Sequence, residues 1–159
     1  AALVDLLNRN LAHIPAPRVP AERGAGALPA AEAGAPLIDT GSPDSIIRRF
    51  AGRPATLRKL YSALQEGIVM HLEAIREARA QNSTAVGAAL HGLKGAAGMY
   101  GAKRLQLAAA STEARLLDGA ASDELDADFD RLDHTGRATV EAVHQLLESL
   151  AGSTDTAER

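Results

Sequence analysis

The sequence of 159 residues predicts an all-α fold: an antiparallel four-helix bundle with a short extra helix at its N-terminal end. Apolar residues recur at three- and four-residue steps over roughly residues 54–150, as they do when one face of each helix packs into a core. No run alternates apolar and polar residues as a half-buried strand does. Aromatic residues make up only 3% of the chain, so its apolar content is mostly Ala and Leu, which favours helices over sheets.

Interruptions of this pattern predict the helix boundaries. Four long helices are expected: from Pro54 to about Ala80, from a cap at Asn82–Ser83 to near Gly101, over about 102–118, and from a cap at Ser122 to about Leu150. Gly119 is the expected stop of the third of these helices. Gly136 interrupts the apolar stripe of the last one and is expected to bend it. A short helix at 43–51 should begin with a Ser42 cap and Pro43 in its first turn, and should cover one end of the bundle.

The N-terminal part of the chain has a different composition. Residues 1–11 contain a short amphipathic helix, which could be the end of a preceding domain. Residues 12–36 hold five of the seven prolines together with several Gly and Ala, and predict a flexible linker. We therefore expect the bundle to occupy residues 37–152, followed by a frayed tail at 153–159.

Composition and charge exclude several classes of function. The absence of Cys rules out disulfides, thiolate metal sites and Cys nucleophiles. A formal charge of −3 argues against a general nucleic-acid binder, which needs a basic face. No stretch approaches 18 apolar residues, so no contact with a membrane is expected. The chain begins with Ala and has no signal-peptide pattern, which suggests a piece excised from a longer protein.

Four of the five histidines are interpreted as surface or boundary residues. No pair among them has a spacing typical of metal ligands, so we expect no metal site. These histidines are His13, His71, His134 and His144.

The remaining histidine, His91, lies in the glycine-rich stretch LHGLKGAAGMYG at residues 90–101. If Leu90, Leu93 and Ala97 face the core, His91 points toward solvent. Each glycine inside a helix costs about 1 kcal/mol relative to Ala, so their accumulation here needs a reason. The small or cationic neighbours on this face are Gly87, Ala88, Lys94, Gly95 and Gly98.

Three explanations compete for this face. The glycines could allow close packing of helices, with His91 an incidental surface residue. A glycine-rich phosphate loop is weakly supported, because GxxGxxG at 95–101 follows a helical pattern rather than a strand and lacks the Gly-Lys-Ser/Thr ending. The third explanation is an exposed nucleophile that a partner must approach closely. Neutral imidazole is a competent nucleophile near neutral pH, and Lys94 can neutralise part of the charge of a phosphoryl group placed on His91.

The stretch HGLKGAAGMYGAKRLQLAAASTEARL resembles the histidine-containing phosphotransfer (HPt) domain of multistep phosphorelays, and the resemblance covers roughly residues 37–150. The positions that match the family pattern are His91, Leu93, Lys94, Gly95, Gly98, Gly101, Leu105 and Glu113. The sequence departs from the pattern at Gly92, where a larger polar residue is more common, at Tyr100 and at Thr112.

The resemblance implies that His91 accepts a phosphoryl group, that Lys94 is its charge partner and that Gly95 keeps the site open. It implies a phosphorelay intermediate without kinase machinery, which takes the group from a receiver-domain Asp and passes it to the Asp of a response regulator. No cofactor is expected in this domain, whereas Mg²⁺ is expected in the partner receiver. The implied setting is cytoplasmic. The N-terminal segment and the Pro-rich linker fit a C-terminal module of a hybrid sensor histidine kinase, a parent protein that could be anchored in the inner membrane.

Residues that could dock a receiver surround His91 or follow its helix. They are Gly87, Ala88, Gly98, Lys103 and Arg104. An alternative hypothesis is a non-catalytic helical bundle that binds a partner, with His91 chemically silent. A third and weaker hypothesis is a module phosphorylated by a separate ATP-binding domain.

Overall fold

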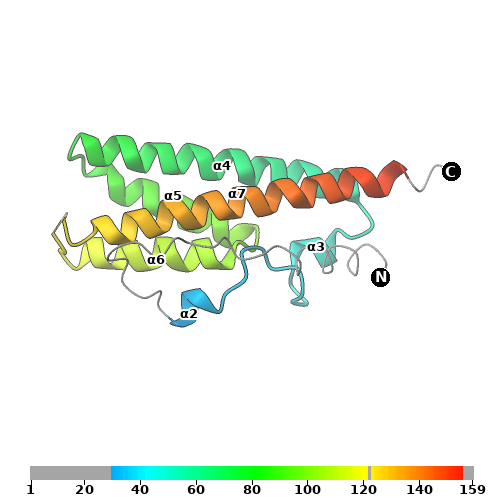
Figure 1. Cartoon of the computed structure of the whole chain (residues 1–159), viewed down its shortest axis with the longest axis horizontal. Helices are drawn as coiled ribbons and strands as arrows, with labels where there is room; N and C mark the ends of the chain where they lie inside the picture. Colours follow the sequence, from blue (N-terminus) through cyan, green and yellow to red (C-terminus); the bar gives the residue numbers. More distant parts are fainter. Residues whose placement is uncertain (1–29, 122, 156–159) are drawn as a thin grey trace.

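The computed structural model describes residues 30–121 and 123–155 (Figure 1). The helix predicted at 1–11, most of the predicted linker, the expected cap Ser122 and residues 156–159 lie outside the described residues. Every regular element within the described ranges is a helix, and none is a strand. The prediction of an all-α fold is confirmed.

Four long helices form the bundle: α4 (Pro54–Ala80), α5 (Ala85–Met99), α6 (Lys103–Leu117) and α7 (Asp126–Asp155). Helices α4 and α6 each pack against both α5 and α7, so the four helices enclose one core (Figure 1). Short turns join α4 to α5 and α5 to α6, which makes these neighbours antiparallel. Helix α7 continues to Asp155, three residues into the stretch expected to be a frayed tail.

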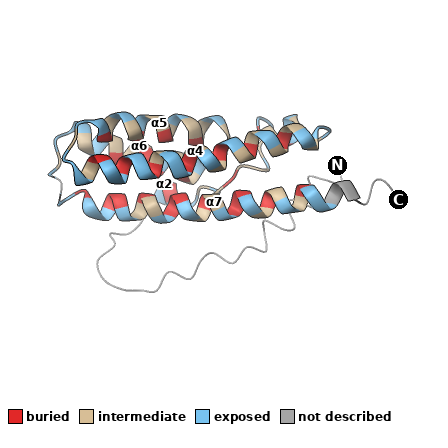
Figure 2. Cartoon of the chain, turned by 90° about the horizontal axis from the view of Figure 1, so that it is seen from above, coloured by how far each residue is buried: buried red, intermediate tan, exposed pale blue. Residues whose placement is uncertain are grey.

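The core is built from the predicted apolar stripes, which lie along the inward sides of the helices (Figure 2). Burying each Leu or Ile side chain contributes about 1.5–3 kcal/mol to folding. The largest fully buried side chains are Tyr61, Ile47, Leu57, Leu64, Ile68, Leu90, Leu93, Leu105, Leu125, Leu132 and Leu146.

Residues in the left-handed backbone region end three of the helices. Asn82 has φ 49° after α4, and the Ser83 amide donates to the Ala78 carbonyl at 2.8 Å, which closes the last turn. Gly101, with φ 77°, and Gly119, with φ 83°, follow α5 and α6. The predicted helix-ending glycines therefore lie where the chain must reverse direction.

The short helix α3 (Ile46–Arg49) is smaller than the helix expected at 43–51, and Ser42 does not cap it. The Ser42 hydroxyl and amide instead donate to the Asp39 carboxylate, with 3.0 Å for the amide. The Ser45 hydroxyl donates to the Asp39 carbonyl at 2.8 Å. Burial acts to raise the pKa of Asp39, but the hydrogen bonds from Ser42 and Gly41 outweigh it, so the pKa is lowered. The physical reason for the difference is a competing local acceptor, which holds residues 39–45 in a turn.

The last residues of the predicted linker lie against the bundle. Helix α2 (Ala30–Ala33) packs on α6, and the buried carboxylate of Glu32 binds Arg131 of α7 at 3.2 Å. Arg104 donates from its side chain to the Ala35 carbonyl at 2.9 Å and from its backbone amide to the Pro36 carbonyl at 3.1 Å. These polar contacts hold a segment whose sequence offers little apolar surface to bury.

Helix α7 is continuous through Gly136, which is buried against α4. A Cβ atom at this position would lie 2.6 Å from Cδ1 of Leu72. Glycine therefore lets α4 and α7 approach closely here.

Candidate functional site

The periodicity of α5 places His91 on the outside of the bundle. Leu90, Leu93 and Ala97 are fully buried, and the 100° rotation per residue turns the next position, His91, away from the core. The His91 side chain is 72% exposed. The sequence prediction of an outward-facing histidine is thereby confirmed.

Glu113 of α6 joins His91 to Lys94. Its Oε1 lies 2.9 Å from Nδ1 of His91, and its Oε2 accepts a hydrogen bond from the Lys94 ammonium. The Glu113 side chain is 13% exposed, against 72% for His91, so the carboxylate lies beneath the imidazole in the seam between α5 and α6. A carboxylate can only accept, so Nδ1 must carry a proton and Nε2 of a neutral ring keeps a free lone pair.

The charge on Glu113 is stabilised by its partners. The hydrogen bond from Lys94 is the largest influence on the pKa of Glu113, and together with the contact to His91 it outweighs desolvation and lowers that pKa. The carboxylate thus stays ionised at neutral pH and fixes the proton of His91 on Nδ1.

The glycines of α5 divide into two groups. A Cβ atom at Gly92 would lie 2.6 Å from Cε1 of His71, and one at Gly98 would lie 2.6 Å from Nε2 of Gln106. At Gly95 a Cβ atom would meet nothing within 4 Å, and Gly95 is exposed one turn after His91. A Cβ atom at either of the first two positions would require the end of the His71 or Gln106 side chain to shift, whereas one at Gly95 would displace no neighbouring side chain.

The other predicted docking residues differ in their surroundings. Ala88 is exposed and Gly87 half-buried, both on the turn of α5 that precedes His91. Lys103 is exposed at the start of α6, with its ammonium 3.4 Å from the Gln106 side-chain oxygen. Arg104 is half-buried and holds Ala35, as described above, so its guanidinium is engaged within the chain.

Sequence reasoning missed that Glu113 contacts both His91 and Lys94. The residue was part of the matching pattern, but the pattern says nothing of its contacts. The ring of His71, which lies against Gly92, was likewise interpreted only as a surface or boundary residue.

The described parts of the chain offer no group of three or more His, Asp or Glu that could hold a metal ion. Over the same residues, no helix is both long and apolar enough to cross a membrane. The chemistry available at the site is that of one exposed imidazole with a carboxylate and an ammonium beside it.

The comparison with protein families finds one family for the bundle. Residues 59–153, which include most of α4, all of α5 and α6 and most of α7, match the family model described as the Hpt domain. The chain belongs to the Hpt domain family. Membership of the Hpt family implies a role in the phosphorelay of two-component signalling, and Hpt domains in general interact with receiver and response-regulator partners. Neither a curated protein nor a solved structure matches the chain.

Proposed function

We propose that His91 accepts a phosphoryl group from the phospho-aspartate of a receiver domain and passes it to the aspartate of a response regulator. The single observation that best supports this is the imidazole whose Nδ1 is held by Glu113, because that contact leaves Nε2 available on a side chain that is 72% exposed. The Hpt match over residues 59–153 also supports a role in phosphoryl transfer.

The transfer begins with Nε2 of His91 attacking the phosphorus of the receiver's aspartyl phosphate. An N–P bond forms, the P–O bond to the aspartate breaks, and the aspartate leaves as a carboxylate. Nδ1 keeps its proton, so the phosphorylated ring carries a positive charge that lies 2.9 Å from the Glu113 carboxylate. The second transfer reverses these bonds on the aspartate of the response regulator. The Mg²⁺ expected in such a reaction belongs to the receiver.

Lys94 is the charge partner of the incoming phosphoryl group. Its ammonium has three N–H donors and donates one hydrogen bond to Glu113, so two N–H groups remain for phosphoryl oxygens. Gly95 keeps the approach to His91 open, since a Cβ atom there would meet no side chain or neighbouring helix of the described residues within 4 Å. The residues proposed to act directly are therefore His91 and Lys94.

The experiment compares the chain with its His91→Gln variant. Each is incubated with receiver domains of the same organism that have been phosphorylated by labelled acetyl phosphate. His144→Gln is a matched control, because His144 is also exposed and lies 3.4 Å from a glutamate, Glu148. Label that survives base and is lost in acid should appear on the wild type and on His144→Gln but not on His91→Gln. Label on His91→Gln would place the acceptor elsewhere. No label on any chain, with every receiver, would favour the non-catalytic binding module.

A further inference from the structure

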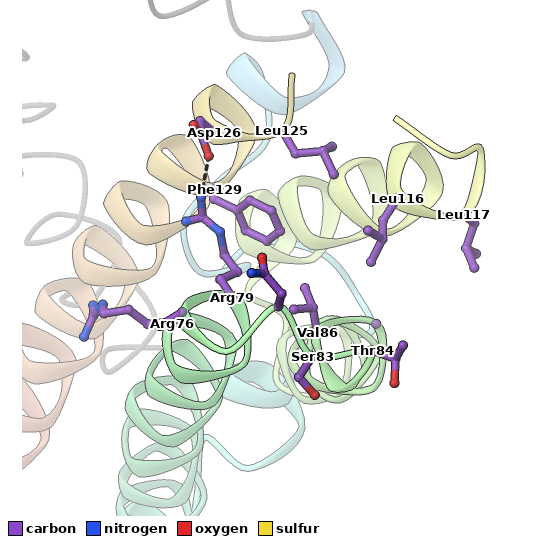
Figure 3. Close-up of a pocket in the computed structure, with 13 residues that line it drawn as sticks. Arg76, Arg79, Ser83, Thr84, Val86, Leu116, Leu117, Leu125, Asp126 and Phe129 are labelled. Carbon is purple, nitrogen blue, oxygen red and sulfur yellow. Dashed lines mark hydrogen bonds and ion pairs between the residues drawn. The ribbon is translucent and has the colours of Figure 1, made fainter. Parts of the chain in front are cut away.

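A second feature of the surface lies at the end of the bundle where α4 turns into α5. A hollow of about 760 Å³ opens there between the ends of α4 and α6 and the beginnings of α5 and α7 (Figure 3). Its apolar lining comes from Val86, Leu116, Leu125 and Phe129. A cavity of about 150 Å³ is enough to hold a benzene molecule, so this hollow can take at least one large apolar side chain.

The hollow adjoins the phosphoryl-accepting site along the seam between α5 and α6. Gly87 lines it and precedes His91 by four residues, which is about 6 Å along the helix axis. On the facing helix, Leu116 lines it and follows Glu113 by three residues. The hollow and the imidazole therefore belong to one continuous strip of surface.

Gly87 is not required by packing within the chain. A Cβ atom there would lie 3.8 Å from Cδ2 of Leu116, which is an ordinary van der Waals contact. Alanine would fit and would favour the helix by about 1 kcal/mol. Gly87 and Gly95 lie one turn before and one turn after His91. Neither glycine is required by packing within the chain, and neither places a side chain on the outer surface of α5.

Leu117 is the most exposed large apolar side chain in the described parts of the chain, at 79%, and it lies on the rim of the hollow (Figure 3). The arginines on the rim already have acidic partners: Arg79 binds Asp126 at 2.6 Å and stacks on Phe129, and Arg76 binds Asp133 at 2.8 Å. An apolar group entering the hollow would therefore leave no guanidinium without a carboxylate, whereas an anionic ligand would compete with these carboxylates.

We propose that this hollow receives an apolar side chain of the receiver domain whose aspartate reacts with His91, with Leu117 packing against that side chain. The proposal rests on the proposed function for its partner. A specific interface buries about 800 Å² on each side, a patch roughly 30 Å across, so a receiver centred on His91 covers a hollow that begins about 6 Å away. Interface hot spots are typically side chains that fill well-packed pockets shielded from water near the centre of the interface.

The test measures binding of the unphosphorylated receiver to chains that carry His91→Gln, since binding needs no phosphoryl transfer. The receiver used is the one that binds the wild type most tightly, so that its choice does not depend on transfer. Leu117→Glu should raise the dissociation constant at least tenfold. Val69→Glu is the matched control, because Val69 is also an exposed apolar residue, at 44%, but lines a separate groove between α4 and α7. It should change the dissociation constant less than twofold.

In the wild-type background, Leu117→Glu should raise the receiver concentration needed for half-maximal transfer and leave the maximal rate within about twofold. Gly87→Leu, which places a side chain in the passage beside Leu116, should act in the same direction. Equal affinities of Leu117→Glu and Val69→Glu for the receiver would overturn the proposal. So would a wild-type dimer that Leu117→Glu dissociates while receiver binding is unchanged, because the occupant would then be a second copy. Labelling of His91→Gln would overturn the proposed function alone, since the binding comparison does not depend on it.

Discussion

Charged side chains gather on both sides of α6, but the two groups differ in how far they reach solvent. On the side that faces α5, Glu113 binds His91 and Lys94, and these two side chains remain 72% and 31% exposed. On the side that faces α7 and α2, the central residue Arg131 is 14% exposed, much as Glu113 is at 13%, but its acidic partners Glu32 and Asp128 are only 2% and 6% exposed. The same kinds of residue thus form an open group on one side and a closed group on the other.

The closed group joins three elements. Arg131 of α7 binds Glu32 of α2 at 3.2 Å and Asp128 of its own helix at 2.8 Å, and Arg115 of α6 also binds Asp128. The carboxylates of Glu32 and Asp128 are 2% and 6% exposed. Charges that are shielded from water in this way fix the position of the segments that carry them. In the open group, by contrast, the imidazole of His91 is 72% exposed and accessible from outside the bundle.

Arg131→Met should have the largest effect on stability. Among the described residues, it would leave the Glu32 carboxylate without a counter-charge and Asp128 with only Arg115, and breaking a buried pair costs about 3–5 kcal/mol. Urea unfolding followed by circular dichroism measures the change. A loss below about 1 kcal/mol would mean that the closed group is no more stabilising than a surface ion pair.

Gly95→Leu tests the open side by filling it. The chain leaves free space at this position, so the variant should be as stable as the wild type or more so, because Leu favours a helix over Gly by up to about 1 kcal/mol. Transfer from a phosphorylated receiver should nevertheless slow at least tenfold, since the new side chain lies one turn from His91. Unchanged transfer rates would show that a partner does not approach over Gly95.

Lys94→Met is the counterpart of Arg131→Met in the open group. Its ion pair is partly exposed, so unfolding free energy should fall by less than about 1 kcal/mol. Transfer should slow several-fold with the helical content retained, because the phosphoryl group loses its cation. Lys94→Arg, which keeps the charge, should recover part of the rate, and transfer at the wild-type rate by Lys94→Met would remove the proposed charge role.

Glu113→Gln should have the smallest effect, and its sign follows from the lowered pKa of Glu113. A carboxylate whose pKa is lower in the folded state stabilises the fold above its ordinary value of 4.5 and loses that contribution as the pH falls through the folded value. The wild type should therefore be more stable than Glu113→Gln at pH 7, and the difference should disappear in acid. Unfolding curves over this pH range measure it, and a difference that grows toward low pH would contradict the assignment.

The sequence was sufficient to predict the faces within each long helix, because helical periodicity alone decides which residues point inward. Leu90, Leu93 and Ala97 are buried and His91 is exposed, as expected. Contacts between helices depend on their relative register, which periodicity does not supply. The approach of Glu113 to His91 is set by the turn at 100–102 that joins α5 to α6, and so it could not be derived from either helix alone.

The region before α4 was harder to predict for another reason. Ser42 has the residue type and the position of a helix cap, but Asp39 lies three residues earlier and competes for its amide and hydroxyl. Residues 30–36 have the composition of a linker, yet contacts made by Arg104 and Arg131, far along the chain, hold them in place. Local composition contains no information about such distant partners.

The ultraviolet absorbance of Tyr61 reports whether the protein is folded. The chain has no tryptophan, and the phenol of Tyr61 is fully buried, with its hydroxyl donating to the Tyr100 carbonyl at 3.4 Å. Burial, with a further contribution from Asp39, raises the pKa of Tyr61 above its ordinary value of 10.0, so the fold loses stability as the pH rises past that value. The ultraviolet absorbance of tyrosinate from this residue should then appear together with unfolding. Label that survives such alkaline treatment is retained by its covalent bond and not by shelter within the fold.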